Sequence, residues 1–365
     1  MARWRAWLIV AVTVMLAWGI RGQHGHERGA AFVGAAAGLA LAAVTGRERW
    51  VWAALWGSLG FALGGTISYG QFVGRALDGS WPATAALIGT GALWGCLGGG
   101  ALGWGYRAAS PGERARLAAG LVVAWWWLDG PLSATLDLGG LRSRGLLLAN
   151  FSVVVLGLFG YYAVYRRDLV IRRLSLATAL GLGAGFLVAP PWLAWGPLSG
   201  WAMDWWKWME HTIGLLGGFA LAWGVFGLPA AAPAPLSRWH RWAAFGWLFI
   251  GVPMWLWANN LVYWWWERRA VSDMVVGLVG MAWLIVLALY LTVGAARVRS
   301  GRWFQHPWSP RALRGLCLAL IWFGTATAVA KTWLPQPWGS TQTIFVGCAV
   351  VLTGLLTAGP ERARS

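Results

Sequence analysis

Apolar runs of roughly 15 to 25 residues recur from one end of the chain to the other, separated by short polar links rich in arginine. A helix needs about 20 residues to cross the ~30 Å hydrocarbon core of a bilayer. The runs do not alternate with a period of two, so they predict helices and not the strands of a barrel. We expect twelve spans, within a range of ten to thirteen, near residues 6–20, 30–45, 50–72, 82–106, 115–128, 146–165, 174–189, 205–228, 239–261, 272–296, 312–330 and 341–358.

Composition points the same way. Of the 365 residues, 58% are hydrophobic and 11% are charged, and the mean hydropathy is +0.57. Soluble domains carry about 25% charged residues. We therefore predict an all-α fold, a polytopic transmembrane helical bundle that forms a single integral membrane domain over residues 1–365. Most of the 33 tryptophans fall near predicted helix ends, where the aromatic belts of membrane proteins lie.

The charges report on topology. The net charge of +17 comes from basic residues that are dispersed over the links, so we expect no nucleic-acid partner. With the N-terminus inside, 20 of the 29 basic residues fall in inner links. The positive-inside rule then places both termini in the cytoplasm of a multi-pass protein of the inner (cytoplasmic) membrane. Eight of the twelve acidic residues fall in outer links, and this bias needs another explanation.

An internal repeat is an open alternative within this map. If the halves are 1–166 and 169–359, the span 30–45 corresponds to the span 205–228. The first follows His26-Glu27 and the second contains Glu210-His211, and each pair is followed by a run rich in glycine and alanine. Six-plus-six repeats of parallel topology occur in transporters. One matching pair of helices gives this hypothesis only limited support.

Glycine spacing predicts which helix faces are buried, because small residues let helices in membranes approach closely. One stripe is purely apolar and consists of Gly91, Gly95, Gly99 and Gly103. Three other stripes end in polar residues at the predicted outer side. They are Gly57, Gly60, Gly64, Ser68, Gln71 and Arg75; Asp204, Lys207, Glu210, His211, Gly214, Gly217 and Gly218; and Glu27, Gly34 and Gly38.

These polar ends predict one site inside the bundle near its outer face. Ionisable residues within a membrane bundle indicate function by default, although the same charges could simply cap helix ends at the interface. We expect Glu27 and Glu210 to pair with basic residues, above all Arg75 and Lys207. The candidate residues for binding a substrate or a proton are Arg21, Gln23, His24, His26, Glu27, Arg28, Gln71, Arg75, Asp204, Lys207, Glu210 and His211.

A metal site is the less favoured interpretation of these residues. The segment RGQHGHERG and the pair Glu210-His211 offer imidazole and carboxylate ligands, but their spacing matches no zinc signature. Histidine titrates near neutral pH, so a His/Glu pair that carries a proton is the simpler hypothesis. We expect neither a metal nor another cofactor.

Standard enzymatic signatures are missing from the sequence, which contains no Walker P-loop, no Gly-x-Ser-x-Gly elbow and no dinucleotide-binding glycine motif. The link Thr45–Trp50 (TGRERW) weakly resembles the basic loop between the second and third helices of major-facilitator transporters, but it lacks most of that motif, so we assign no family.

Two classes of function remain, and the sequence leaves open whether the protein is an enzyme. The favoured one is a secondary transporter, with proton coupling, for a small anionic solute. The alternative is a membrane-embedded transferase that acts on a lipid-linked substrate at the outer leaflet, and a channel or structural subunit is a weaker third option. The expected partners are the lipid bilayer and either the solute or the lipid-linked substrate; the oligomeric state is not indicated.

Overall fold

The structure is a computed structural model that describes residues 1–65, 67, 69–107, 156–228, 235–267, 272–333 and 339–358, with scattered positions between 110 and 123. Every regular element within these ranges is helical and none is a strand, which confirms the predicted all-α class. The expected span 115–128 falls largely outside the described residues, as does the first part of the span 146–165.

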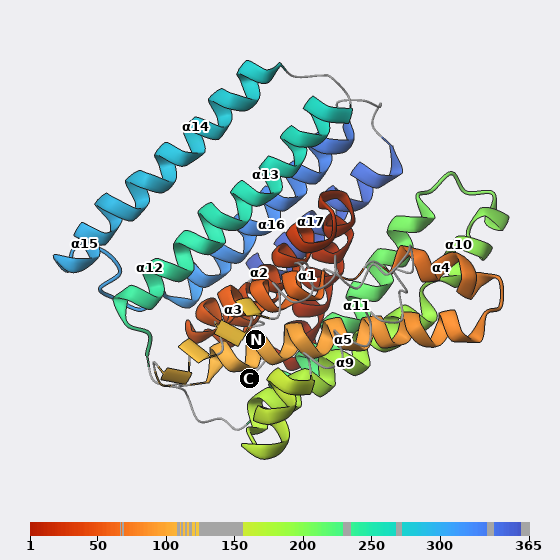
Figure 1. Ribbon diagram of the computed structural model, residues 1–365, viewed down its shortest axis with the longest axis horizontal. Helices are drawn as coiled ribbons and strands as arrows, with labels where there is room; N and C mark the ends of the chain where they lie inside the picture. Colours follow the sequence, from red (N-terminus) through yellow and green to blue (C-terminus); the bar gives the residue numbers. More distant parts are fainter. Residues whose placement is uncertain are drawn as a thin grey trace, which may run out of the picture.

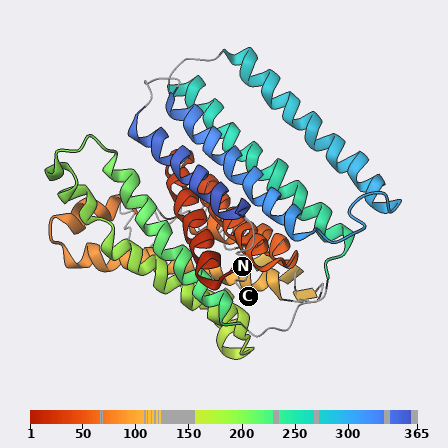
Figure 2. The same ribbon diagram turned by 180° about the vertical axis from the view of Figure 1, so that it is seen from behind.

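Three helices form the centre of the bundle: α1 (Arg3–His24), α2 (His26–Thr45) and α3 (Arg49–Gly64). One side of this centre packs against α5 (Trp81–Tyr106) and α11 (Trp205–Phe226), and α9 (Leu169–Val188) packs on both of these helices, as Figure 1 shows. The other side packs against α13 (Val252–Val262), α16 (Pro310–Trp333) and α17 (Ser340–Thr357), as Figure 2 shows from behind. Seven helices of the described chain are long and apolar enough to cross a membrane, so the count of twelve stays a prediction.

Several elements join into longer rods. The segment α12 (Arg238–Gly246) continues through the π-helical turn η3 (Trp247–Gly251) into α13 and the π-helical turn η4 (Tyr263–Glu267). Likewise α14 (Asp273–Leu289) continues through η5 (Tyr290–Gly294) into α15 (Ala295–Arg299). The remaining elements are α4 (Gly70–Leu77), η1 (Leu156–Tyr165), α10 (Pro191–Trp195) and η2 (Pro197–Ser199).

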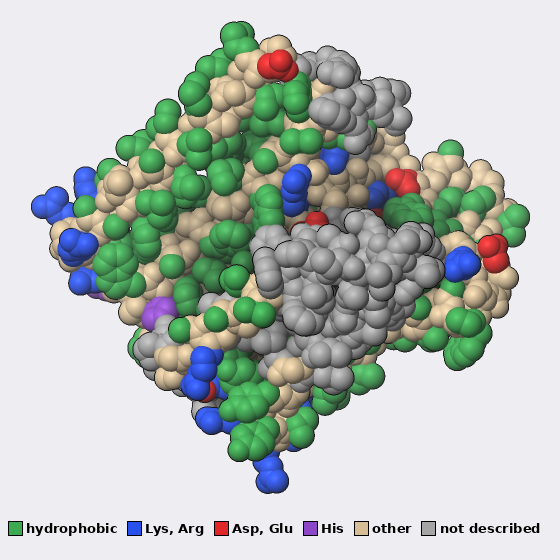
Figure 3. All heavy atoms as spheres, in the orientation of Figure 1, with side chains coloured by type: hydrophobic (Ala, Val, Ile, Leu, Met, Phe, Trp, Pro, Cys, Tyr) green, Lys and Arg blue, Asp and Glu red, His purple; other side chains and the backbone are tan. Residues whose placement is uncertain are grey.

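Helix α14 is the outermost element. None of its residues is buried, and Figure 3 shows apolar side chains over this face of the molecule, with basic side chains gathered near α15. A stack of Tyr290 on Trp242, with ring centroids 5.4 Å apart, holds the end of α14 that leads into α15. Such an apolar rod suits a lipid environment, because only helices satisfy all their backbone hydrogen bonds there.

Two sharp corners depart from the expected helix boundaries. The segment RGQHGHERG is not a loop: α1 continues to His24, α2 begins at His26, and Gly25 alone joins them with φ of 82° and ψ of −175°. Only glycine adopts that conformation readily. The expected helix 50–72 is also wrong, because α3 ends at Gly64 and α4 starts separately at Gly70. Arg75, which follows that break, therefore does not continue the stripe of Gly57, Gly60 and Gly64 on α3.

The glycine stripes lie at helix contacts, as predicted. A Cβ on Gly95 of α5 would lie 2.2 Å from the Thr178 carbonyl oxygen of α9, and one on Gly34 of α2 would lie 2.2 Å from the Gly57 carbonyl oxygen of α3. Gly218 of α11 meets the backbone of Ala11 in α1 in the same way, at 2.7 Å. These helices therefore touch backbone to backbone, as small-residue interfaces in membranes do.

One end of the bundle is tied together by arginine. Arg5 near the start of α1 donates to the carbonyls of Leu355 and Ala358 at the end of α17, so the two termini of the described chain lie at the same end. Arg241 forms two hydrogen bonds of 2.8 Å with the Glu48 carboxylate in the link between α2 and α3. Burial disfavours the charge on Glu48, but the bonds from Arg241 and the Leu236 N–H outweigh it and hold the pKa of Glu48 below 4.5.

Candidate functional site

The opposite end of the bundle carries the predicted polar site. The last turn of α1 holds Arg21, and the first turns of α11 hold Lys207, Glu210 and His211. Helix α11 begins at this height because the Asp204 side chain accepts from the Lys207 N–H at 3.1 Å, an N-terminal cap. Because residues three and four apart share a helix face, Lys207, Glu210 and His211 project together into the bundle.

Glu210 is the centre of a buried hydrogen-bond cluster. Lys207 Nζ donates to Glu210 Oε2 at 2.5 Å, and the Tyr69 hydroxyl donates to Oε1 at 2.9 Å. Arg21 Nη1 donates to the Tyr69 hydroxyl at 3.0 Å and lies 3.8 Å from Glu210 Oε1. Trp206 covers the carboxylate and donates its indole N–H to Oε1 at 3.2 Å. We call Arg21, Tyr69, Lys207 and Glu210 the Glu210 cluster.

Every member of the Glu210 cluster is withdrawn from solvent. The exposed fraction is 1% for Glu210, 2% for Tyr69, 3% for Arg21 and 5% for Lys207. Leaving charges in such a place is costly unless they are paired and hydrogen-bonded. The Glu210 cluster is therefore not the set of exposed helix caps that the simpler interpretation of the sequence described.

Aromatic rings and glycines hold the cluster in shape. The Arg21 guanidinium carbon lies 4.8 Å from the ring centroid of Tyr69 and 4.7 Å from that of Trp94, within cation–π range. A Cβ on Gly22 would lie 2.0 Å from Glu210 Oε2, so the carboxylate occupies space that any other residue at position 22 would fill. The fit of α1 against α11 thus depends on glycine at this height.

His211 lies one turn deeper. Its ring packs on the backbone of Gly19, where a Cβ would come within 2.2 Å of Cε1. Its Nδ1 is 2.7 Å from the Lys207 carbonyl oxygen, which can only accept, so Nδ1 carries a proton. Its Nε2 has no hydrogen-bond partner among the described residues. In the neutral ring this atom is an acceptor, so it is available to a proton.

A second polar group surrounds the neighbouring face of α1. His24, buried with no exposed surface, places Nε2 3.3 Å from the Thr327 hydroxyl of α16. The Asn260 side chain of α13 donates to the Thr327 carbonyl at 2.8 Å. Lys331 Nζ donates to the Asn259 side chain at 2.8 Å and to the Gln23 carbonyl. A third cation thus lies beside the Glu210 cluster.

The charges within the Glu210 cluster are unequal in number. In the Glu210 cluster two buried cations, Arg21 and Lys207, share one carboxylate. Asp204 is half-buried, and its oxygens accept from the Lys207 N–H and the Thr341 hydroxyl. The four residues of the cluster therefore sum to one net positive charge, and both of its cations lie against the same carboxylate.

The remaining sequence candidates have different outcomes. The predicted pairing of Lys207 with Glu210 is confirmed, whereas the pairing with Arg75 is wrong, because Arg75 lies exposed on α4 beyond the helix break. Glu27 and Arg28 are half-buried at the start of α2, and neither forms an ion pair with another described residue. The side chains of two further candidates, His26 and Gln71, lie outside the described part of the structure.

Metal binding has no geometric support in the described residues. No group of three or more histidine, cysteine, aspartate or glutamate side chains in that part of the chain is arranged to hold a metal ion. His24 forms a hydrogen bond with the Thr327 hydroxyl, and His211 forms one with the Lys207 carbonyl. The two imidazoles therefore belong to different hydrogen-bond groups.

Sequence reasoning missed several residues of the site. Tyr69 joins Arg21 to Glu210, but it was counted as part of a continuous helix. The pair Asn259-Asn260 stands inside an otherwise apolar segment, and that interruption was a usable signal. Lys331 is not among the predicted site residues, because nothing in the sequence indicates that it reaches the end of α1.

The fold and the site together define the class: an all-helical, multi-pass membrane protein with a buried ion-pair cluster at one end of its bundle. Comparisons of the chain with protein-family models, with curated proteins and with solved structures find no match. Its function must therefore be argued from the geometry of its own residues.

Proposed function

We propose that the protein is a proton-coupled secondary transporter of a small anionic solute in the inner (cytoplasmic) membrane. The observation that carries this proposal is the buried pair of cations in the Glu210 cluster, where Arg21 and Lys207 both lie against the carboxylate of Glu210. Arginine and lysine bind anionic oxygens well. The carboxylate of Glu210 would therefore compete with a solute anion for Arg21 and Lys207.

The orientation follows from the distribution of arginine. The end of the bundle opposite the Glu210 cluster holds Arg5, Arg47, Arg49 and Arg241 in bonds to neighbouring helix ends. The positive-inside rule assigns that end to the cytoplasm. The Glu210 cluster then faces the extracytoplasmic side, and both termini are cytoplasmic.

Exchange of one anion for another gives a coupling mechanism. When a solute anion takes Lys207 and Arg21, Glu210 loses its partners and becomes neutral by accepting a proton. Two cations then face one anion in either state, so the net charge of the buried site stays at +1. A monovalent anion would therefore cross together with one proton and no net charge. The neighbouring residue His211 is our candidate relay for that proton, because its buried Nε2 has no hydrogen-bond partner among the described residues.

A membrane-embedded transferase is the second candidate, and the packing below the Glu210 cluster is compatible with it. Below the Glu210 cluster the bundle is filled by aromatic side chains: Trp18 lies against Phe61, Trp94 and Phe186 at centroid distances of 6.5, 5.2 and 6.1 Å. A site closed toward the cytoplasm suits an enzyme that works from the outer leaflet. A transporter needs the same closure in its outward-facing or occluded state, so this observation fits both classes.

Proteoliposomes that contain a pH-sensitive dye test the transport proposal. Phosphate, sulfate, succinate and glutamate would be added outside in turn, with gluconate as an ionic-strength control. We expect at least one of them to acidify the interior at least tenfold faster than in protein-free vesicles. Glu210→Gln should abolish the acidification yet keep exchange of labelled anion for anion, because only the proton acceptor is lost.

The matched control is Glu27→Gln, which removes a carboxylate outside the Glu210 cluster and should leave the acidification rate within about twofold of wild type. Proton flux that survives unchanged in Glu210→Gln contradicts the mechanism. Absence of flux for every anion, together with turnover of a polyprenyl-phosphate-linked donor by the same vesicles, would favour the transferase.

A further inference from the structure

A pocket lies at the end of the bundle opposite the Glu210 cluster, and helix α11 contributes residues to both. Its volume is about 300 Å³, at the lower end of the range for small-molecule sites. It is formed where α2 ends, α3 begins, α5 ends and α11 ends, because its wall includes Thr45, Trp50, Tyr106 and Val225. By the orientation proposed above, it opens toward the cytoplasm.

The lining combines one cation with flat and apolar surfaces. Among the described residues that line the pocket, Arg47 is the only charged one, and its Nη1 donates to the Tyr106 hydroxyl at 2.6 Å. The rings of Trp50 and Tyr106 stack with centroids 4.0 Å apart. Phe226 and Leu228 complete an apolar wall. The pocket therefore offers a guanidinium and hydroxyl groups to an anionic group, and an apolar wall to the hydrocarbon part of the same molecule.

We infer that this pocket is the cytoplasmic binding site of the protein for a small organic anion, a carboxylate with a compact apolar body. The inference rests on the proposed transport function, because it assigns the pocket to the same class of solute as the Glu210 cluster. The inference adds a second binding site to the proposed function and assigns Arg47 as the residue that binds the anion there. It also implies a route between the pocket and the Glu210 cluster.

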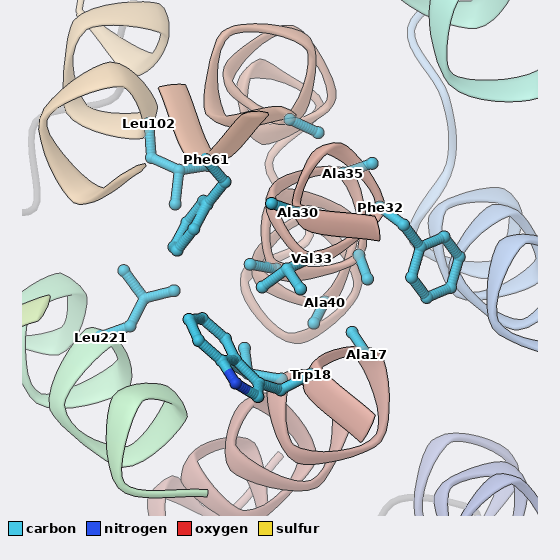
Figure 4. Close-up of a cluster of buried hydrophobic side chains, with 14 of the residues drawn as sticks. Ala17, Trp18, Ala30, Phe32, Val33, Ala35, Ala40, Phe61, Leu102 and Leu221 are labelled. Atoms are coloured by element: carbon cyan, nitrogen blue, oxygen red, sulfur yellow. The ribbon is translucent and has the colours of Figure 1, made fainter. Parts of the chain in front are cut away.

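The route follows one face of each of two helices, α5 and α11. On α5, Tyr106 lines the pocket and Leu102 precedes it by four residues; on α11, Val225 lines the pocket and Leu221 precedes it by four. Residues four apart lie on one helix face. Leu102 and Leu221 therefore lie one turn farther from the pocket end of their helices. Figure 4 shows their side chains converging with Phe61 and Trp18 in the core of the bundle. These four buried side chains are the barrier that would have to part during transport.

Thiol labelling in inverted membrane vesicles tests the pocket directly. The three native cysteines, Cys96, Cys317 and Cys348, are free and would be replaced by alanine before Thr45→Cys is introduced. An anionic methanethiosulfonate reagent should label Cys at position 45, and saturating benzoate should slow that labelling at least fivefold. Ser300→Cys, at an exposed position of the same end, is the matched control and should label at the same rate with or without benzoate.

Arg47→Gln should remove the protection by benzoate. Since Arg47 also bonds to Tyr106, a second variant separates charge from structure: Tyr106→Phe loses the hydrogen bond, keeps the guanidinium and should retain protection. Labelling at position 45 that benzoate does not slow would overturn the inference. So would protection that persists in Arg47→Gln.

Lys207→Gln distinguishes this inference from the proposed function. It disables the Glu210 cluster but leaves the pocket untouched, so benzoate should still protect position 45 while anion-driven acidification is lost. Protection without any transport by the wild type would leave the pocket as an anion site and refute its place on a transport route. If the wild type shows anion-driven acidification but benzoate does not slow labelling at position 45, the pocket is not an anion site. The proposed role of the Glu210 cluster would be unaffected.

Discussion

Glu210→Gln should be the most damaging single substitution of a charged residue in this protein, lowering the free energy of unfolding by about 3–5 kcal/mol. The variant leaves Lys207 and Arg21 buried with no carboxylate between them. It also weakens the acceptor of the Tyr69 hydroxyl and the Trp206 indole. Thermal unfolding of the detergent-solubilised protein measures the loss, alongside the loss of proton-coupled flux.

The control for this prediction is Glu27→Gln. Glu27 lies in the first turn of α2, half-buried and outside the described ion pairs, so its charge interacts chiefly with the helix dipole. Such an interaction contributes about 0.3–1 kcal/mol. Equal shifts in melting temperature for the two variants would show that the Glu210 cluster is no more important to the fold than a helix cap.

Gly95→Leu is expected to separate two helices. The Cβ of any residue at position 95 would lie 2.2 Å from the carbonyl oxygen of Thr178 and 2.7 Å from the Cα of Ala179. Both atoms belong to the backbone of α9, so α5 and α9 must move apart before the side chain fits. Overpacking a core typically costs about 1–3 kcal/mol, and a collision with backbone should place this variant at or above the top of that range.

Gly280→Leu is the matched control, because it makes the same exchange within a helix and meets nothing within 4 Å. Leucine is also the better helix former by several tenths of a kcal/mol or more. We expect an unchanged or slightly raised melting temperature for Gly280→Leu and a clear fall, or failure to express, for Gly95→Leu. Similar melting temperatures for both would mean that the glycine stripe of α5 does not hold α9.

The part of the site that the sequence could predict depends on local periodicity. Lys207, Glu210 and His211 lie three and four apart beside glycines, and that spacing alone places them on the packing face of α11. The Gly91–Gly103 stripe was readable for the same reason. A helix face is a local property, so its direction follows from the chain without knowledge of the neighbouring helices.

The missed residues depend on breaks and on long-range contacts. The prediction for Arg75 assumed that one helix runs through residues 64–70, whereas the chain leaves the helix after Gly64 and brings Tyr69 into the core. Two adjacent glycines and a third at Gly70 made that break plausible. No local pattern could place Lys331 of α16 against the end of α1, because that contact joins residues 308 positions apart.

The proposed six-plus-six repeat, with halves 1–166 and 169–359, stays a prediction. So does the single-domain assignment over residues 1–365. The two helices that suggested the repeat, α2 and α11, have different neighbours: α11 packs on α1 and α9, whereas α2 packs on α1, α3 and α16. Much of the chain between residues 108 and 155 lies outside the described ranges, so the helices of the first half cannot be matched one by one to those of the second.

Chemical rescue tests the central claim, that Arg21 and Lys207 form an anion site which Glu210 occupies at rest. Glu210→Ala removes the carboxylate and leaves space beside both cations. Acetate, which supplies a carboxylate of the right size, should raise the melting temperature of Glu210→Ala by many degrees and barely change that of wild type. Gluconate at equal ionic strength should rescue neither protein. If acetate and gluconate shift Glu210→Ala equally, the two cations do not form an anion site, and the proposed transport mechanism fails with it.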